Sequence, residues 1–179
     1  SNIFLSRIVN LREMLSNQGL DGIYLTNLTS VRYISGFTGS AGSCLITEED
    51  SYFISDGRYD VQSKKQVNNM TRYIDFGNHV SIIEKNKLLK DGLNLAFEGD
   101  HTSFSNYKAI TDSFPKVQWK STSMLMENLQ AVKDESELNA IRTAVEITDV
   151  IYEEILPMLK PGTTEKEVAN QLVLRYRQE

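Results

Sequence analysis

The sequence predicts an α/β protein built on a mixed sheet of about six strands flanked by helices. Along residues 3–119, short apolar runs alternate with segments of helical periodicity, a pattern typical of a sheet covered by helices. Two of the runs, 43–47 and 51–55, are separated by the polar turn Glu48-Glu49-Asp50. This spacing predicts a hairpin, and therefore an antiparallel pair in a sheet whose other strands alternate with helices.

The first element is expected to be an amphipathic helix over residues 3–18. Apolar residues recur there at three- and four-residue intervals, which places them on one face of a helix. They are Phe4, Ile8, Leu11 and Leu15. Gly19 follows, and glycine often ends a helix because it adopts left-handed backbone angles without strain.

Strands and helices then alternate up to residue 119. Asp91-Gly92 marks a turn into a strand, and Thr102 or Ser103 can cap the next helix, since a hydroxyl accepts a hydrogen bond from a free backbone N–H. The expected elements are, in order, a strand at 21–26, a short helix at 30–35, the hairpin strands at 43–47 and 51–55, a helix at 59–67, a strand at 72–76, a helix at 81–89, a strand at 93–98, the capped helix and a strand at 117–119.

A domain boundary is expected at residues 121–123, where the strands stop. It divides the chain into a domain at 1–122 and a linker with helices at 123–179. Asp134 with Glu137, and Thr164 with Glu167, have the spacing of capping boxes that begin two amphipathic helices. No later segment of the sequence covers their apolar faces, which suggests that the chain was cut from a larger protein.

The bulk composition excludes several kinds of partner. A formal net charge of −5 without a basic cluster argues against nucleic acid, because phosphate binding needs an excess of Lys and Arg. No apolar run approaches the roughly 20 residues that cross a bilayer, so no membrane partner is expected. The single cysteine, Cys44, lies in an apolar run and suggests a reducing compartment, hence a cytoplasmic location.

Residues 26–59 carry the most distinctive residue order. Gly36, Gly39 and Gly42 separate a helical segment from the first hairpin strand, and glycines before a strand do not match a dinucleotide-binding loop. The loop has a single aromatic residue, Phe37, among glycines, serines and a threonine. We therefore expect little of it to be buried, and Phe37 to be available to a ligand.

No catalytic residue and no metal ligand is expected in this chain. The two histidines, His79 and His101, do not stand in a ligand pattern, and Ser40 and Ser43 have no histidine base near them in sequence. His79 is expected in a solvent-exposed loop. The cluster 98–101, Glu-Gly-Asp-His, is interpreted as a polar turn, with a ligand site as the less favoured alternative.

Asp56 and Arg58 allow two interpretations. An arginine grips a carboxylate in a bidentate fashion, so the pair could clamp a substrate. It could instead form an internal tie that locks the hairpin to the next helix, which is the favoured interpretation. In that case loss of Arg58 would leave a buried carboxylate unpaired and destabilise the fold.

Two motifs together resemble a known family. RYISGFTGS at 32–40 and DGRY at 56–59, joined across the hairpin, are similar to the amino-terminal domain of the creatinase, prolidase and Xaa-Pro aminopeptidase family, metallopeptidase family M24. VKDESEL at 132–138 and KPGTTE at 160–165 resemble the opening of that family's pita-bread catalytic domain. Gln130 departs from the family pattern, in which arginine is common before the Val-Lys pair.

The resemblance implies a creatinase-type amino-terminal domain with ribonuclease H-like layering, followed by the first helices of an incomplete pita-bread domain. It also implies a parent metallo-exopeptidase that cleaves the bond before proline in peptides with proline at the second position. Two divalent metal ions (Mn, Co or Zn) would be held by residues beyond Glu179, so this chain alone is expected to be inactive. A homodimer or higher homo-oligomer is implied for the parent.

Within this family the 36–42 loop lies at the rim of a catalytic site, often that of a neighbouring subunit. The resemblance therefore makes Phe37, Thr38, Ser40 and Arg58 candidates for substrate-rim or subunit contact. The alternative for Phe37 is a ring packed under its own loop. A second function stays open, because the same two-domain fold without metal ligands serves as a peptide- or protein-binding module.

Overall fold

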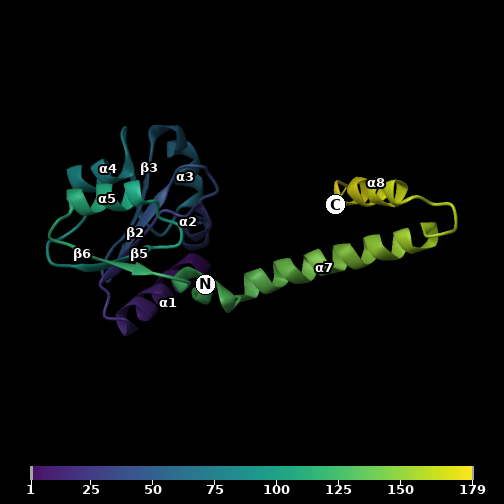
Figure 1. Cartoon of the computed structure of the whole chain (residues 1–179), viewed down its shortest axis with the longest axis horizontal. Helices are drawn as coiled ribbons and strands as arrows, with labels where there is room; N and C mark the ends of the chain where they lie inside the picture. Colours follow the sequence, from purple (N-terminus) through teal and green to yellow (C-terminus); the bar gives the residue numbers. More distant parts are fainter. Residues whose placement is uncertain (1, 179) are drawn as a thin grey trace. The chain divides into compact units, whose positions relative to one another are not determined.

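The structure is a computed structural model that describes residues 2–178 (Figure 1). It divides into two compact units, one ending at Ala131 and the other beginning at Val132. The first unit contains all the strands described and the second contains helices.

The first unit is built on one six-stranded sheet, with the strand order β4-β3-β2-β1-β5-β6. β2 runs antiparallel to both of its neighbours, and the other adjacent strands are parallel. The predicted mixed α/β sheet is therefore confirmed. The strands are β1 (Gly22–Leu25), β2 (Ser43–Thr47), β3 (Ser51–Ser55), β4 (Thr71–Ile74), β5 (Asn94–Glu98) and β6 (Gln118–Thr122).

Helices cover both faces of this sheet. α1 (Ile3–Asn17), α2 (Leu28–Ser35) and α6 (Leu125–Ala131) contribute buried apolar residues to one core cluster. α4 (His79–Lys85) and α5 (Phe104–Ser113) contribute to the cluster on the opposite face. The short helix η1 (Gly57–Tyr59) and α3 (Asp60–Gln66) join β3 to β4.

Neighbouring residues of the central strands belong to different cores. In β1, Ile23 and Leu25 join the cluster under α1, whereas Tyr24 joins the cluster under α4 and α5. In β3, Phe53 joins the cluster under α1 and Ile54 joins the cluster under α4 and α5. This alternation follows from the two-residue period of a strand, and it explains why the central strands are continuous apolar runs.

The amino-terminal helix forms as its periodicity predicts. Ile8, Leu11 and Leu15 are almost completely buried, and the Asn2 side chain caps the helix by accepting a hydrogen bond from the Phe4 N–H at 3.2 Å. Gly19 has a φ of +68° after the last turn. The predicted end of the helix at this glycine is confirmed.

The first unit extends beyond the boundary that the sequence suggests at residue 122. α6 follows β6, and its Leu125, Met126 and Leu129 are buried in the core beneath α1 and α2. This helix has no clear signal in the sequence, because its seven residues are too few to show a period. The assignment of the later helices to a pita-bread domain stays a prediction.

The second unit consists of α7 (Glu135–Ile155), the short helix η2 (Leu156–Met158) and α8 (Glu165–Tyr176). Both predicted capping boxes are present, one at Asp134 and one at Thr164. Ile151 and Ile155 are buried, but many of the unit's other apolar side chains are exposed. None of the helices described in residues 2–178 combines the length and apolar character that a membrane span needs.

A buried carboxylate fastens the start of α2 to the end of β5. Glu98 is 5% exposed, and it accepts hydrogen bonds from the Ser30 hydroxyl at 2.5 Å and from the Asn27 N–H at 3.3 Å. Burial raises the pKa of Glu98, while these two hydrogen bonds lower it in part. The charged carboxylate is therefore disfavoured in the folded protein relative to the unfolded chain.

This pKa shift predicts a pH-dependent stability. An acid with a raised folded-state pKa contributes stability that is present below its unfolded pKa and is lost as pH rises through the folded value. We expect the melting temperature of the wild type minus that of Glu98→Gln to fall between pH 4 and pH 7. Thermal denaturation at unit pH steps measures this difference, and Glu84→Gln, at an exposed position, is the control. A difference that stays constant or grows with pH would contradict the assignment.

Candidate functional site

The 36–42 loop connects α2 to β2 and is held by hydrogen bonds along its length. Gly36 ends α2 with a φ of +79°. The Thr38 N–H donates to Gln66 Oε1 at 3.0 Å, and Gln66 Nε2 donates back to the Thr38 hydroxyl at 2.9 Å. The Ser55 hydroxyl donates to the Ala41 carbonyl at 2.6 Å. The loop is therefore fixed against both α3 and β3.

Phe37 anchors the loop from below. Its side chain is 1% exposed, and its ring centroid lies 4.7 Å from that of Phe53 and 5.4 Å, edge-on, from that of Tyr59. The expectation that little of this loop is buried is therefore wrong for Phe37. In this structure Phe37 is a core residue, which favours the packing alternative over direct substrate contact.

The glycines of the loop make room for this ring. A Cβ on Gly39 would lie 2.2 Å from the Phe37 ring, and one on Gly42 would lie 3.0 Å from it. Any larger residue at position 39 would overlap a ring that is itself enclosed by the core. The glycines thus allow the loop backbone to pass directly over its own aromatic side chain.

The outer surface of the loop carries hydroxyl groups. Thr38 and Ser40 are exposed, and the Ser40 hydroxyl lies 2.6 Å from the phenol oxygen of Tyr59. The guanidinium of Arg58 lies 5.5 Å from the Tyr59 ring centroid. Ser40 and Arg58 therefore both contact Tyr59 at the surface, Thr38 is held by Gln62 and Gln66 of α3, and Phe37 is buried.

Asp56 and Arg58 form an ion pair, but it is local. Arg58 Nε and Nη2 each donate to one carboxylate oxygen of Asp56 at 2.9 Å, and the Arg58 N–H donates to the same carboxylate at 3.0 Å. The hydrogen bonds from Arg58 lower the pKa of Asp56 to about 2. The Arg58 side chain is 75% exposed.

This geometry corrects one premise of the sequence analysis. The pair lies between the end of β3 and the first turn of η1, the next helical element, but Arg58 is exposed and not buried. An exposed ion pair contributes little to stability, so the large destabilisation expected for loss of Arg58 does not follow. Its part as a substrate clamp stays a prediction.

The two histidines occupy different surroundings. His79 is half-buried as the first residue of α4, so its expected place in a solvent-exposed loop is wrong. Burial lowers the pKa of His79, and the nearby carboxylate of Asp56 raises it in part. His101 lies at the surface, with its Nε2 3.2 Å from Glu127 Oε1.

The 98–101 segment is the polar turn that the sequence suggests. The Asp100 carboxylate accepts a hydrogen bond from the Ser123 hydroxyl at 2.6 Å, and the His101 N–H donates to the Glu98 carbonyl at 3.1 Å. Within residues 2–178, no three His, Cys, Asp or Glu side chains come together in a way that could hold a metal ion. The described residues therefore do not fit the metal centre that the family resemblance implies.

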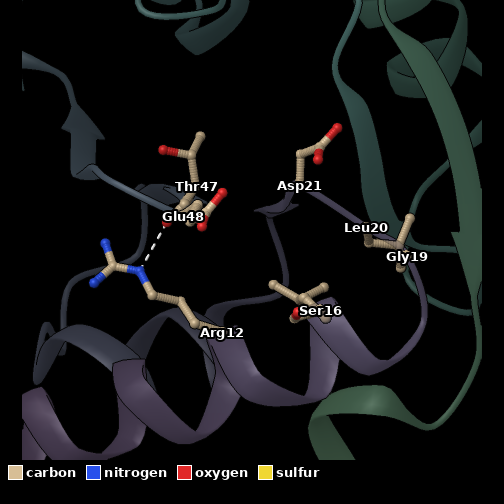
Figure 2. Close-up of a pocket in the computed structure, with 8 residues that line it drawn as sticks. Arg12, Ser16, Gly19, Leu20, Asp21, Thr47 and Glu48 are labelled. Carbon is tan, nitrogen blue, oxygen red and sulfur yellow. Dashed lines mark hydrogen bonds between the residues drawn. The ribbon is translucent and has the colours of Figure 1, made fainter.

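A small pocket of about 210 Å³ lies at the amino-terminal edge of β1 (Figure 2). Figure 2 shows Arg12 reaching from α1 toward the hairpin turn. Its Nε donates to the Thr47 carbonyl at 2.7 Å, and its Nη2 donates to the Asp50 carbonyl at 3.0 Å. Arg12 therefore fastens the hairpin to the first helix, a role with no local sequence signal because its partners are more than 30 residues away.

These features define a class of protein. It is an α/β domain in which a glycine-rich loop, packed on one aromatic ring, leads into β2, the one strand of the described sheet that runs opposite to the others. The family model for the Creatinase/Prolidase N-terminal domain matches residues 7–132. The chain belongs to this family. The two sequence motifs that suggested it both lie within the matched range.

Known relatives extend the likeness over almost the whole chain. The uncharacterized peptidase YqhT of Bacillus subtilis (strain 168) is 30% identical over 172 residues, covering 96% of this chain and 48% of the relative. The solved Xaa-Pro dipeptidase from Bacillus anthracis is 35% identical with a TM-score of 0.85, covering 98% and 49% of the two chains. For the X-Pro aminopeptidase from Thermotoga maritima MSB8 the identity is 29%, the TM-score 0.76 and the coverage 93% and 49%. The chain thus spans about half the length of these relatives.

The packing of Phe37 predicts a large loss of stability on truncation. Phe37→Ala removes a ring that is 1% exposed, and such a change costs about 3–5 kcal/mol. We expect a correspondingly lower denaturation midpoint in urea. Phe76→Ala removes an equal side chain that is 90% exposed and should leave the midpoint almost unchanged. Equal midpoints for the two variants would show that Phe37 is not a core residue.

Proposed function

We propose that this chain forms the amino-terminal, non-catalytic portion of a longer metal-dependent Xaa-Pro aminopeptidase or dipeptidase. The observation that carries the proposal is the match to two solved enzymes described as an Xaa-Pro dipeptidase and an X-Pro aminopeptidase, of which the chain covers 49% each. The proposed reaction is hydrolysis of the peptide bond before proline, and the proposed substrates are peptides with proline at the second position.

The proposed contribution of this portion is to shape the substrate entrance and to support subunit assembly. A rim residue must be exposed and yet held in place, because an ordered contact loses less entropy on binding than a mobile one. Thr38, Ser40 and Arg58 meet both conditions, since they lie at the surface and their segments are fixed by hydrogen bonds and by the Phe37 ring. The proposed assembly is a homodimer or a higher homo-oligomer.

The proposed metal centre, with two divalent ions (Mn, Co or Zn), belongs to the longer protein. Bound divalent ions can activate a water molecule and polarise a carbonyl group. No step of that chemistry is assigned to residues 2–178, which do not assemble a set of ligands. We also propose a cytoplasmic location, supported by the free, buried thiol of Cys44.

The peptidase proposal predicts a clear difference between this chain and the longer protein. We expect the longer protein to cleave Xaa-Pro dipeptides or Xaa-Pro-Xaa tripeptides, to lose activity about 100-fold after chelation and to recover it with Mn²⁺. The chain of 179 residues should be inactive under all of these conditions. A longer protein that binds such peptides without cleaving them would support a binding module instead, and a hydrolytically active 179-residue chain would overturn the assignment.

The rim proposal predicts a kinetic effect without a stability effect. Arg58→Met in the longer protein should lower kcat/KM for Xaa-Pro substrates about tenfold. Its melting temperature should change by about 3 °C or less, because the Arg58 side chain is 75% exposed. Lys90→Met removes an exposed cation that is paired with Glu49 and serves as the control. Unchanged kinetics for Arg58→Met would remove Arg58 from the rim while leaving the peptidase assignment untouched.

A further inference from the structure

A cavity of about 560 Å³ opens at the carboxyl ends of β1 and β5. Tyr24 and Phe97 line it near these strand ends, and its walls include the β1–α2 connection, the 40–42 segment, the start of α4 and one face of α5. A volume of roughly 300–1,000 Å³ is typical of pockets that hold small molecules. The cavity is therefore large enough for a ligand.

The topology of the sheet places this cavity at a switch point. The chain leaves β1 into α2, which packs on one face of the sheet, and it leaves β5 into α5, which packs on the opposite face. When two adjacent parallel strands continue to opposite faces, their connections diverge and leave a crevice outside the strand ends. Ligands of open α/β sheets bind in crevices of this kind.

The lining of the crevice is apolar at the base and polar, but uncharged, at the mouth. Tyr24, Phe97 and Ile110 are each less than 10% exposed. His79 and Asn106 are accessible and lie on two different helices. None of the described residues that line the crevice is Lys, Arg, Asp or Glu. A charged ligand would therefore lose hydration without gaining an ionic partner from the lining; the nearby Asp56 carboxylate is already paired with Arg58.

Two of the lining side chains, His79 and Asn106, can form hydrogen bonds with a ligand. Both side chains reach the crevice with solvent access: Asn106 is exposed and His79 is half-buried. An asparagine amide offers two donors and an acceptor, and a neutral imidazole offers one of each. Burial lowers the pKa of His79, which favours its neutral imidazole. This pattern matches the donors and acceptors of an amide group.

We propose that this crevice binds a small, uncharged molecule with an apolar body and an amide group. The apolar body lies on Tyr24, Phe97 and Ile110, and the amide is bound by Asn106 and His79. The small side chains of Ala41 and Ala109 in the lining leave room for the ligand. The proposal does not rest on the peptidase assignment, because it uses only the lining of this unit.

Three probes that differ in charge test the proposal directly. N-acetyl-leucinamide is neutral, N-acetyl-leucine is anionic and leucinamide is cationic at pH 7. We titrate each into the isotopically labelled 179-residue chain and follow amide ¹H–¹⁵N chemical shifts. The neutral probe should bind with a Kd of about 1 mM or tighter and shift Gly42, His79 and Asn106, whereas the charged probes should bind at least about tenfold more weakly. Equal binding of all three, shifts confined to other regions, or no binding of the neutral probe would overturn the proposal.

Matched variants distinguish binding in the crevice from adventitious binding elsewhere on the protein. Ala109→Phe fills the crevice from α5 and should abolish the shifts, while Ser105→Phe on the same helix, at an exposed position outside the lining, should leave them intact. His79→Ala should weaken binding several-fold without closing the cavity. Melting curves identify any variant that fails to fold. Unchanged binding by folded Ala109→Phe would exclude the crevice as the site.

Discussion

The contact between the Phe37 ring and the backbone of its own loop is the constraint on which the candidate site depends. The ring joins β3 through Phe53 and η1 through Tyr59, so one side chain connects three segments. A glycine-rich loop loses much conformational entropy when it is ordered. Burial of a large aromatic side chain offsets that loss, and the loop can thus be both rich in glycine and fixed in position.

The reversed direction of β2 explains why the loop and the crevice lie together. Because β2 is antiparallel to β1, its first residues pair with the last residues of β1, as Cys44 does with Leu25. The loop that leads into β2 therefore reaches the edge where the parallel strands end. Its 40–42 segment forms a wall of the crevice, while Thr38 lies exposed at the surface. A structural change inside the crevice and one at the proposed rim would therefore both affect the same short segment, residues 38–42.

Features set by neighbouring residues could be predicted from the sequence, and features set by packing could not. The hairpin strands 43–47 and 51–55 and the capping boxes at Asp134 and Thr164 were all predicted correctly, because a local turn or cap defines each of them. The depth of Phe37 and the burial of His79 depend on segments that are distant in sequence. The crevice could not be predicted either, because it arises where two connections diverge to opposite faces.

The hydrogen bonds from Arg12 to the hairpin turn also have an implication for the order in which the chain folds. A hairpin closes within about 1–10 μs because its contacts are local. We expect the contacts that span 35 and 38 residues to form later, since the intervening chain must first be confined. The turn between β2 and β3 therefore depends on hydrogen bonds from Arg12 of α1, the amino-terminal helix. We therefore expect the hairpin turn to reach its final geometry only when α1 docks and Arg12 binds the carbonyl groups of Thr47 and Asp50.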